Sequence, residues 1–298
     1  MDYFLTIAGV QHSFYASFLK LPVYSSSQKS YQQFFFENSQ SAYLNNCDVY
    51  FKEGCGPAIN QLDKVFDSNS LWSYYKKEND FYIVSRFPLY EDPIWIAGVQ
   101  SSKQHITIYC SPETIMKPKN QMMFNPMMYP LDQILMMHFL ALNFGMLIHA
   151  AGWRINDSGW VFAGKSGAGK STISNLIVEH TGTEFLSDDR IIVRKINNEF
   201  LMYGTPWPGD AGYAVNDSVP LKGIFFLSKG QENSIQKLNS SDAVSRLMPV
   251  ASIPWYDREK VELLMDFCDT LIGAIPMYEL TFVPGKSAVD MLSGFVNV

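Results

Sequence analysis

The residues from Gly164 to Ser171 read G-K-S-G-A-G-K-S, which fills every fixed position of the phosphate-loop pattern G-x-x-x-x-G-K-[ST]. Glycines in such a loop let backbone N–H groups approach phosphate oxygens, and the helix that follows adds the positive end of its dipole. The motif therefore predicts binding of a nucleotide phosphate together with Mg²⁺. The predicted phosphate-binding residues are Gly164, Ser166, Gly167, Ala168, Gly169, Lys170, Ser171 and Thr172.

Phosphoryl transfer needs positioned cations, a metal ion and a group that orients the acceptor. Lys170 is expected to contact the outer phosphates, and Ser171 to place its hydroxyl on Mg²⁺. Asp188 and Asp189 come about one helix and one strand after the loop, a spacing that suits carboxylates at a strand end facing the phosphates. One could hold Mg²⁺ through a coordinated water while the other orients or deprotonates an acceptor hydroxyl, and the two roles are exchangeable.

Three nearby side chains have both a structural and a functional interpretation. His149 lies in the apolar, β-like run 147–151, where a lone histidine is more often a core residue than a catalyst. Arg190 either pairs with the adjacent carboxylates or reaches a phosphate. Asp210 either helps to position metal or acceptor, or belongs to a structural loop over residues 204–212, whose glycines and prolines predict a shaped turn.

The elements that must position these residues can be predicted from the hydrophobic pattern. The run 160–163 predicts the strand that enters the phosphate loop, and 172–180 the helix that leaves it. The turn residues at 156–159 predict a hairpin, which places the strand 146–155, with His149, beside the entering strand. Further strands are expected at 184–186, 191–195, 200–203, 223–227 and 277–282, and helices at 131–142, 241–247, 258–275 and 287–295.

The chain of 298 residues is long enough for two domains, and a hydrophobic fraction of 47% indicates a packed core. Candidate strands at 3–10, 81–87, 94–99 and 105–110, with a loop-like stretch at 25–46, predict a β-rich N-terminal domain over residues 1–130. Pro126 and Pro130 mark the boundary, and residues 131–298 are expected to form the nucleotide-binding domain.

Several classes of protein are disfavoured by composition. A net charge of -6 argues against a nucleic-acid partner. The apolar stretch 131–153 is as long as a membrane span, but its polar residues favour a helix followed by a strand over a membrane protein. The N-terminus lacks the positive region of a secretory signal, so a cytoplasmic location is expected. Cys47, Cys55, Cys110 and Cys268 form no C-x-x-C pair, which favours reduced structural thiols over disulfides or a zinc site.

The series formed by His149, the segment AGKSGAGKS at 163–171 and the segment LSDDR at 186–190 resembles the catalytic domain of HPr kinase/phosphorylase. The resemblance covers roughly residues 145–228. It implies an α/β fold like the HPr kinase C-terminal domain, related to phosphoenolpyruvate carboxykinase, preceded by a smaller β-rich domain. In that family, a histidine before the loop and an Asp-Asp pair surround ATP, metal and the target serine. The resemblance thus implies His149, Lys170, Asp188 and Asp189 as catalytic residues, and Ser171, Asp188 and Asp189 as Mg²⁺ residues.

The downstream region departs from HPr kinases, which carry a segment of the type L-E-x-R-G-L-G. This chain reads Y-G-T-P-W-P-G-D at 203–210, which is similar to divergent HPr-kinase-like proteins encoded beside peptide natural-product pathways. The resemblance implies an ATP- and Mg²⁺-dependent kinase for a hydroxyl of a protein, peptide or small molecule, rather than for HPr.

Two other functions stay open at this point. One is a nucleotide-dependent binding or switch module without kinase activity. The other is a carboxykinase-like enzyme, which ranks last because no arginine-rich carboxylate site is evident near the motif. By analogy with the hexameric HPr kinases, a homo-oligomer is also an expectation.

Overall fold

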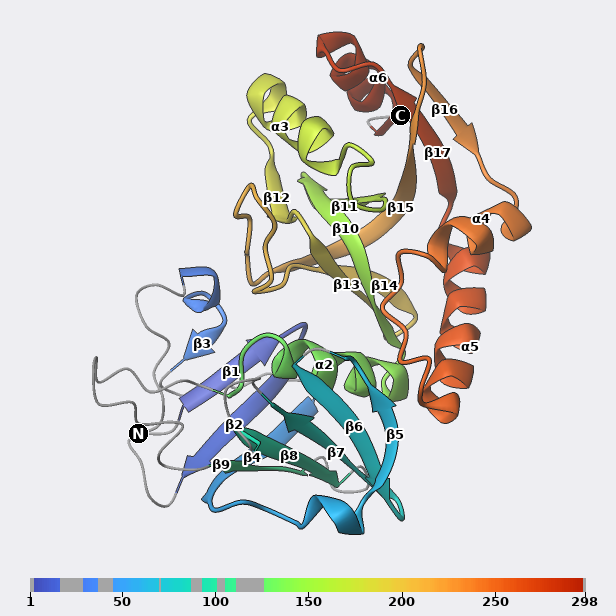
Figure 1. Cartoon of the computed structure of the whole chain (residues 1–298). Coiled ribbons are helices and arrows are strands. Elements are labelled where there is room, and N and C mark those ends of the chain that lie inside the picture. Colours follow the sequence, from blue (N-terminus) through green and yellow to red (C-terminus); the bar gives the residue numbers. More distant parts are fainter. Residues whose placement is uncertain are drawn as a thin grey trace. The chain divides into compact units, whose positions relative to one another are not determined.

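The computed structural model describes residues 3–16, 29–36, 45–69, 71–86, 93–100, 105–110 and 126–296. The chain forms two compact units, Met1–Gln133 and Ile134–Val298 (Figure 1). The sequence predicted a domain boundary after residue 130, and the structure divides the chain after residue 133. Helices occur together with two separate sheets, so the protein is of the mixed α/β class, as the sequence predicted.

The first unit is built on a nine-stranded sheet with the order β3-β1-β2-β4-β9-β8-β7-β6-β5. The β2–β4 and β4–β9 pairs are parallel and the other pairs are antiparallel. Its elements are β1 (Tyr3–Ile7), β2 (Val10–Ala16), the 3-10 helix η1 (Lys29–Tyr31), β3 (Phe35–Phe36), β4 (Asn45–Glu53), the 3-10 helix η2 (Ile59–Gln61), β5 (Asp63–Asp67), β6 (Trp72–Lys77), β7 (Asp80–Ser85), β8 (Trp95–Gln100) and β9 (His105–Cys110).

Two sequence predictions for this unit were wrong in part. The expected strand 3–10 is a hairpin, because Ala8 and Gly9 both take positive φ values, 51° and 74°, and turn the chain between β1 and β2. The expected loop 25–46 contains η1 and β3, and the aromatic rings of Tyr31 and Phe34 are buried. Residues 25–28 and 37–44 of this stretch lie outside the described part of the chain.

The second unit contains an eight-stranded sheet with the order β11-β10-β13-β14-β15-β17-β16; β12 also pairs with β10, and β11 also pairs with β15. The β11–β15 and β15–β17 pairs are parallel. Its elements are α2 (Leu131–Leu142), which starts within the first unit, β10 (Gly145–Ile155), β11 (Ser158–Ala163), α3 (Lys170–Thr181), β12 (Glu184–Ser187), β13 (Arg190–Ile196), β14 (Glu199–Tyr203), β15 (Ser218–Lys229), β16 (Ser234–Lys237), α4 (Ser240–Leu247), α5 (Arg258–Ala274), β17 (Met277–Phe282) and α6 (Lys286–Val296).

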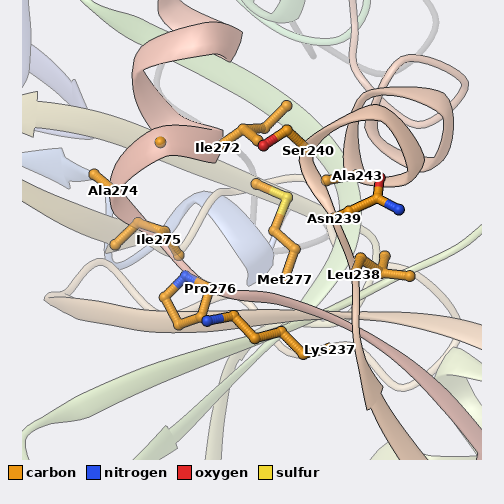
Figure 2. A pocket seen from close by; sticks show the side chains of 11 residues that line it. Lys237, Leu238, Asn239, Ser240, Ala243, Ile272, Ala274, Ile275, Pro276 and Met277 are labelled. Atoms are coloured by element: carbon orange, nitrogen blue, oxygen red, sulfur yellow. The ribbon is translucent and has the colours of Figure 1, made fainter.

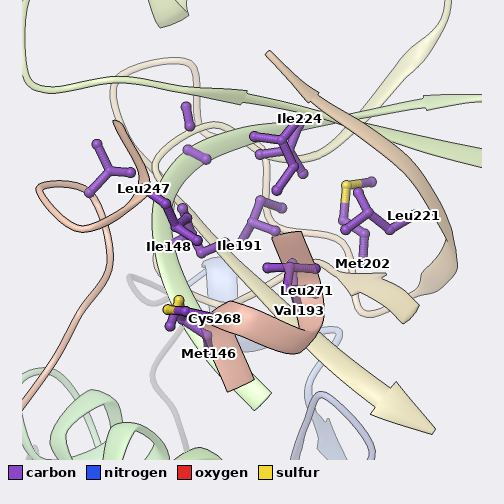
Figure 3. Close-up of a cluster of buried hydrophobic side chains, with 14 of the residues drawn as sticks. Met146, Ile148, Ile191, Val193, Met202, Leu221, Ile224, Leu247, Cys268 and Leu271 are labelled. Carbon is purple, nitrogen blue, oxygen red and sulfur yellow. The ribbon is translucent and has the colours of Figure 1, made fainter. Parts of the chain in front are cut away.

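Alternate residues of the central strands enter two different cores, because successive side chains on a strand point to opposite faces. Val161 of β11 packs in the cluster covered by α4 and α5, which Figure 3 shows with Ile148, Ile224 and Leu271. Phe162, the next residue, packs in the cluster covered by α3 and α6. The sheet is therefore buried on both faces, which explains the nearly continuous apolar runs in β10, β11 and β15.

The apolar stretch 131–153 folds as α2 followed by most of β10, as the sequence predicted. Throughout the described ranges, none of the helices combines the length and the apolar character that a bilayer span requires.

Candidate phosphate-binding site

The phosphate loop connects the end of β11 at Ala163 to the start of α3 at Lys170. Gly167 and Gly169 have φ values of 78° and 107°, which side chains other than hydrogen rarely permit. No side chain caps the first turn of α3, whose N-cap residue is Gly169. An uncapped helix start that follows a glycine turn leaves backbone N–H groups for an anion, so the loop geometry fits phosphate.

The Lys170 side chain is folded back over its own loop and is only 7% exposed. Its Nζ donates to the carbonyl oxygens of Gly164 and Lys165, at 2.8 and 3.5 Å, and lies 2.9 Å from Nε2 of His149. Burial lowers the pKa of Lys170 below its usual value; Asp189 opposes this effect and Arg190 reinforces it. The carbonyl contacts hold the ammonium group beside the glycines that would surround a phosphate.

Strand β10 places His149 at the loop. Its neighbours Ile148 and Ala150 point into the core, so His149 faces the opposite way and is partly exposed. His149 lies directly opposite Arg190 of β13, and the Ala150 N–H donates to the Asp189 carbonyl at 3.0 Å. The pairing with β10 thus brings the Asp-Asp segment, more than thirty residues along the chain, to the histidine.

Asp189 lies at the centre of a group of charges. Its Oδ1 is 2.8 Å from His149 Nε2, and its Oδ2 is 3.2 Å from Arg190 Nη1. Burial raises the pKa of Asp189, but the hydrogen bond from His149 and the charges of Arg190, His149 and Lys170 outweigh burial and bring the pKa below its usual value. A ring nitrogen cannot donate and accept at once. When Nε2 of His149 carries the ring proton, it donates to Asp189; when the proton is on Nδ1, Nε2 accepts from Lys170 instead.

Asp188 has different partners. It is 3% exposed, its Oδ1 accepts the Gly209 N–H at 2.9 Å, and its Oδ2 accepts the Ala211 N–H at 2.7 Å. Both carboxylate oxygens therefore bind backbone groups of the segment between β14 and β15. The two adjacent aspartates, which the sequence could not tell apart, differ clearly in their surroundings.

Most of the predicted residues line one pocket of about 520 Å³. The sequence did not place Gly209 in this site, and it left Asp210 open between two interpretations; both residues line the pocket. Predicted residues Gly164 and Ala168 instead line a neighbouring pocket of about 350 Å³. The described residues that line the first pocket are His149, Ser166, Gly167, Gly169, Lys170, Ser171, Thr172, Asp188, Asp189, Gly209 and Asp210.

A further pocket of about 530 Å³ lies where α4 begins and α5 ends (Figure 2). Met277 is directed between Ile272 and Ser240 in this view. Among the described residues that line it, Lys237 carries the only charge. With neither carboxylate nor imidazole, this lining does not offer the acid–base groups found around the phosphate loop.

Metal ligands are sparse in the described ranges. These contain no group of three or more His, Cys, Asp and Glu side chains arranged to hold a metal ion. Mg²⁺ commonly binds through one or two protein groups together with substrate phosphates, and Ser171 and Asp189 can supply such groups in this pocket.

The four cysteines are free thiols, as expected, and burial raises the pKa of Cys47, Cys110 and Cys268 to about 12.

Comparisons with known proteins place the chain in a family. The model of the family described as SynChlorMet cassette protein ScmC matches residues 113–284, more than half of the chain and all of the pocket. No curated protein sequence matches. The HPr(Ser) kinase/phosphatase from Coxiella burnetii is similar in structure, with a TM-score of 0.31 and 13% identity over 51% of this chain and 88% of that one.

The family match confirms the predicted association with a natural-product cassette. The chain belongs to the ScmC family of SynChlorMet cassette proteins.

Proposed function

We propose that this chain is an ATP- and Mg²⁺-dependent phosphotransferase that moves the γ-phosphoryl group to a hydroxyl of a protein, peptide or small molecule. The observation that supports this proposal is the shared pocket. An uncapped helix start, a buried lysine and an ion-paired aspartate all line it. Phosphoryl transfer relies on positioned charge and orientation, and these residue types supply both.

The phosphate-binding part of the proposal rests on the loop. Backbone N–H groups from Gly167 to Thr172 would bind phosphate oxygens, helped by the α3 dipole. Lys170 would exchange the carbonyls of Gly164 and Lys165 for phosphate oxygens. Ser171 would hold Mg²⁺, which when bound would supply positive charge that neutralises the phosphates.

The acceptor part rests on Asp189. Because its pKa is low, it is ionised at neutral pH, and His149 and Arg190 fix the direction of its oxygens. Asp189 would take the acceptor proton as the hydroxyl oxygen bonds to the γ-phosphorus and the bond to the β-phosphate oxygen breaks. The loose transition state of phosphoryl transfer makes deprotonation late, so a weakly basic carboxylate is sufficient.

Transfer from [γ-³²P]ATP to an array of hydroxyl-bearing peptides and small molecules tests the proposal. Lys170→Ala and Asp189→Asn should each reduce labelling at least about a hundredfold, the usual scale for removing a charge that stabilises a transition state, while circular dichroism remains unchanged. Lys286→Ala, which removes a surface lysine paired with Asp290, is the matched control. Labelling by Lys170→Ala at the wild-type rate would contradict the proposal.

A nucleotide-dependent switch without transfer is the second candidate, and one observation favours it. Asp188 is fully engaged with backbone N–H groups, and Asp189 is a weak base that already has two partners. Such a pocket could bind ATP without activating an acceptor. ATP binding with no labelled product across the array, together with nucleotide-dependent changes in the first unit, would select this candidate.

A further inference from the structure

The segment 204–217, between β14 and β15, forms one wall of the phosphate-loop pocket through Gly209 and Asp210. Its ends are fixed by backbone contacts. The Gly204 N–H donates to the Asp217 carbonyl at 3.1 Å, and the Val215 N–H donates to the Leu186 carbonyl of β12 at 2.9 Å. We call this segment the wall loop. It is closed at its base and attached to the strand that precedes the Asp-Asp pair.

The tip of the wall loop is attached to Asp188. The two amides that Asp188 accepts, from Gly209 and Ala211, flank Asp210 in sequence. A carboxylate that accepts two N–H bonds in a buried position fixes both peptide groups, since each bond to a charged acceptor is stronger than a neutral one. Asp210, between them, is exposed on the pocket wall.

The contact between tip and aspartates is close. A Cβ on Gly209 would lie 3.0 Å from Asp188 Oδ2 and 3.2 Å from the Cβ of Asp189. A larger residue at this position would meet both aspartates, so the tip or the Asp188 side chain would have to shift. Glycine at 209 therefore serves the approach of the loop to Asp188.

The three pocket aspartates differ in what remains open to a ligand. Asp188 has both oxygens on backbone amides, and Asp189 has one oxygen near His149 and the other near Arg190. In the part of the chain that the structure describes, the Asp210 carboxylate has neither a hydrogen-bond nor an ion-pair partner. It is thus the pocket carboxylate most accessible to an incoming cation.

We propose that Asp188 is a positioning residue that holds the wall-loop tip, and that it acts through Asp210, whose carboxylate binds the water shell of the divalent ion of a metal–nucleotide complex. This inference rests on the proposed function. The sequence placed Asp188 either at the metal or at the acceptor hydroxyl; this inference instead makes it the support of the residue that contacts the metal's water shell. Mg²⁺ usually keeps several waters in nucleotide sites, so a carboxylate opposite the phosphate loop can act through them.

The experiment compares Asp188→Asn, Asp210→Asn, the double variant and the control Asp217→Asn. Asp217 belongs to the same loop but pairs with Arg154 at the surface, outside the pocket lining. Hydrogen–deuterium exchange reports the amides of residues 204–214, and calorimetry gives the affinity for ATP in Mg²⁺ and in EDTA. Gly209→Ala reaches the same tip from the other side if Asp188→Asn does not fold.

Asp188→Asn should speed exchange at the Gly209 and Ala211 amides about ten- to hundredfold, the scale of one lost bond to a charged group. Asp210→Asn should keep wild-type exchange. Both should weaken ATP binding in Mg²⁺ about ten- to hundredfold, the usual effect of removing an outer-shell metal partner, and leave binding in EDTA unchanged. The double variant should bind no worse than either single variant, and Asp217→Asn should match the wild type.

Other outcomes would overturn the inference. Weaker Mg²⁺–ATP binding by Asp188→Asn with unchanged exchange would make Asp188 a direct ligand. Wild-type Mg²⁺–ATP binding by Asp210→Asn would remove Asp210 from the metal complex. Absence of ATP binding by the wild type in both conditions would defeat the proposed function and the Asp210 assignment, while exchange in Asp188→Asn would still decide whether Asp188 holds the loop.

Discussion

Among the single residues of the pocket, Asp189 balances the largest number of neighbouring charges. It contacts His149 and Arg190, and its charge also favours the protonated form of the buried Lys170. Without it, Asp188 would be the remaining carboxylate that opposes the effects of burial and Arg190 on Lys170. Asp189 therefore raises the pKa of the lysine that is expected to bind phosphate, against the effect of burial.

The pH dependence of ATP binding should reveal this coupling. Lys170 has a pKa below its usual 10.5, so the protonated, phosphate-binding form is lost at a lower pH than for a free lysine. In Asp189→Asn the stronger of the two carboxylate effects that raise the pKa of Lys170 is gone, so this pKa falls further. The alkaline decline in ATP affinity, measured by calorimetry, should therefore begin at a lower pH in Asp189→Asn than in the wild type.

Lys170→Arg is the control for this measurement, because a guanidinium keeps its charge over the whole alkaline range. Its ATP affinity, whatever its absolute level, should not show the decline. If ATP affinity declines over the same alkaline pH range in the wild type and in Asp189→Asn, Asp189 does not control the protonation of Lys170.

Residue types and spacing were sufficient to assemble most of the pocket, because the strand–loop–helix pattern places Lys170 and Ser171 whatever the rest of the fold does. The contact of His149 with Asp189 required the pairing of β10 with β13, which the sequence did not predict. The partners of Asp188 are backbone amides at residues 209 and 211, and backbone positions in an irregular loop are not encoded by residue type.

Among the elements, two helices begin in contrasting ways. The first turn of α4 is capped by Asn239, whose side chain accepts the Asp242 N–H at 2.9 Å. The first turn of α3 has Gly169 in the same position and no side-chain cap, although an isolated helix would gain stability from one. Because no side chain caps α3, its first N–H groups face the pocket, where phosphate oxygens could accept their hydrogen bonds.

The two positions should respond differently to alanine. Asn239→Ala should lower the free energy of unfolding by about 1 kcal/mol, the usual value of an N-cap, and leave ATP affinity unchanged. Gly169→Ala forces an alanine into a φ of 107° with its Cβ 3.1 Å from the Phe282 ring, so it should cost about 1–3 kcal/mol and also weaken ATP binding. Urea unfolding and calorimetry separate the two effects; unchanged ATP affinity in Gly169→Ala would count against the loop as the phosphate site.

The sequence predicted elements best where periodicity was strong. The bounds of α2 and β17 are confirmed to the residue, and the turn at Asn156 and Asp157 joins β10 and β11 as expected. The sequence missed β16, because its residues Ser234–Lys237 are polar and form the edge of the sheet, where burial does not require an apolar pattern. Strands β4, β5 and β6 were missed for a similar reason, since charged and polar residues interrupt their alternation.

At the scale of the whole molecule, the described residues that line the phosphate-loop pocket belong to the second unit, Ile134–Val298. A ligand bound there stabilises the second unit by its own binding free energy. Whether the ligand also changes the first unit depends on energetic coupling between the pocket and that unit. A ligand shifts a conformational equilibrium only if it binds the two conformations with different affinity. The two candidate functions differ on this point.

Hydrogen exchange of the full chain with Mg²⁺–ATP distinguishes them. At a hundredfold excess over the dissociation constant, the ligand should slow exchange in residues 164–172 and 204–214 by an amount corresponding to about 2.7 kcal/mol. For a phosphotransferase with a self-contained site, amides of β4 and β9 in the first unit should exchange as they do without ATP. For a switch, these amides should change as well, and Lys170→Ala should abolish both responses. A response in β4 and β9 without any labelled product would replace the kinase proposal with the switch, because the binding free energy would then be used to alter the first unit rather than to reach a transition state.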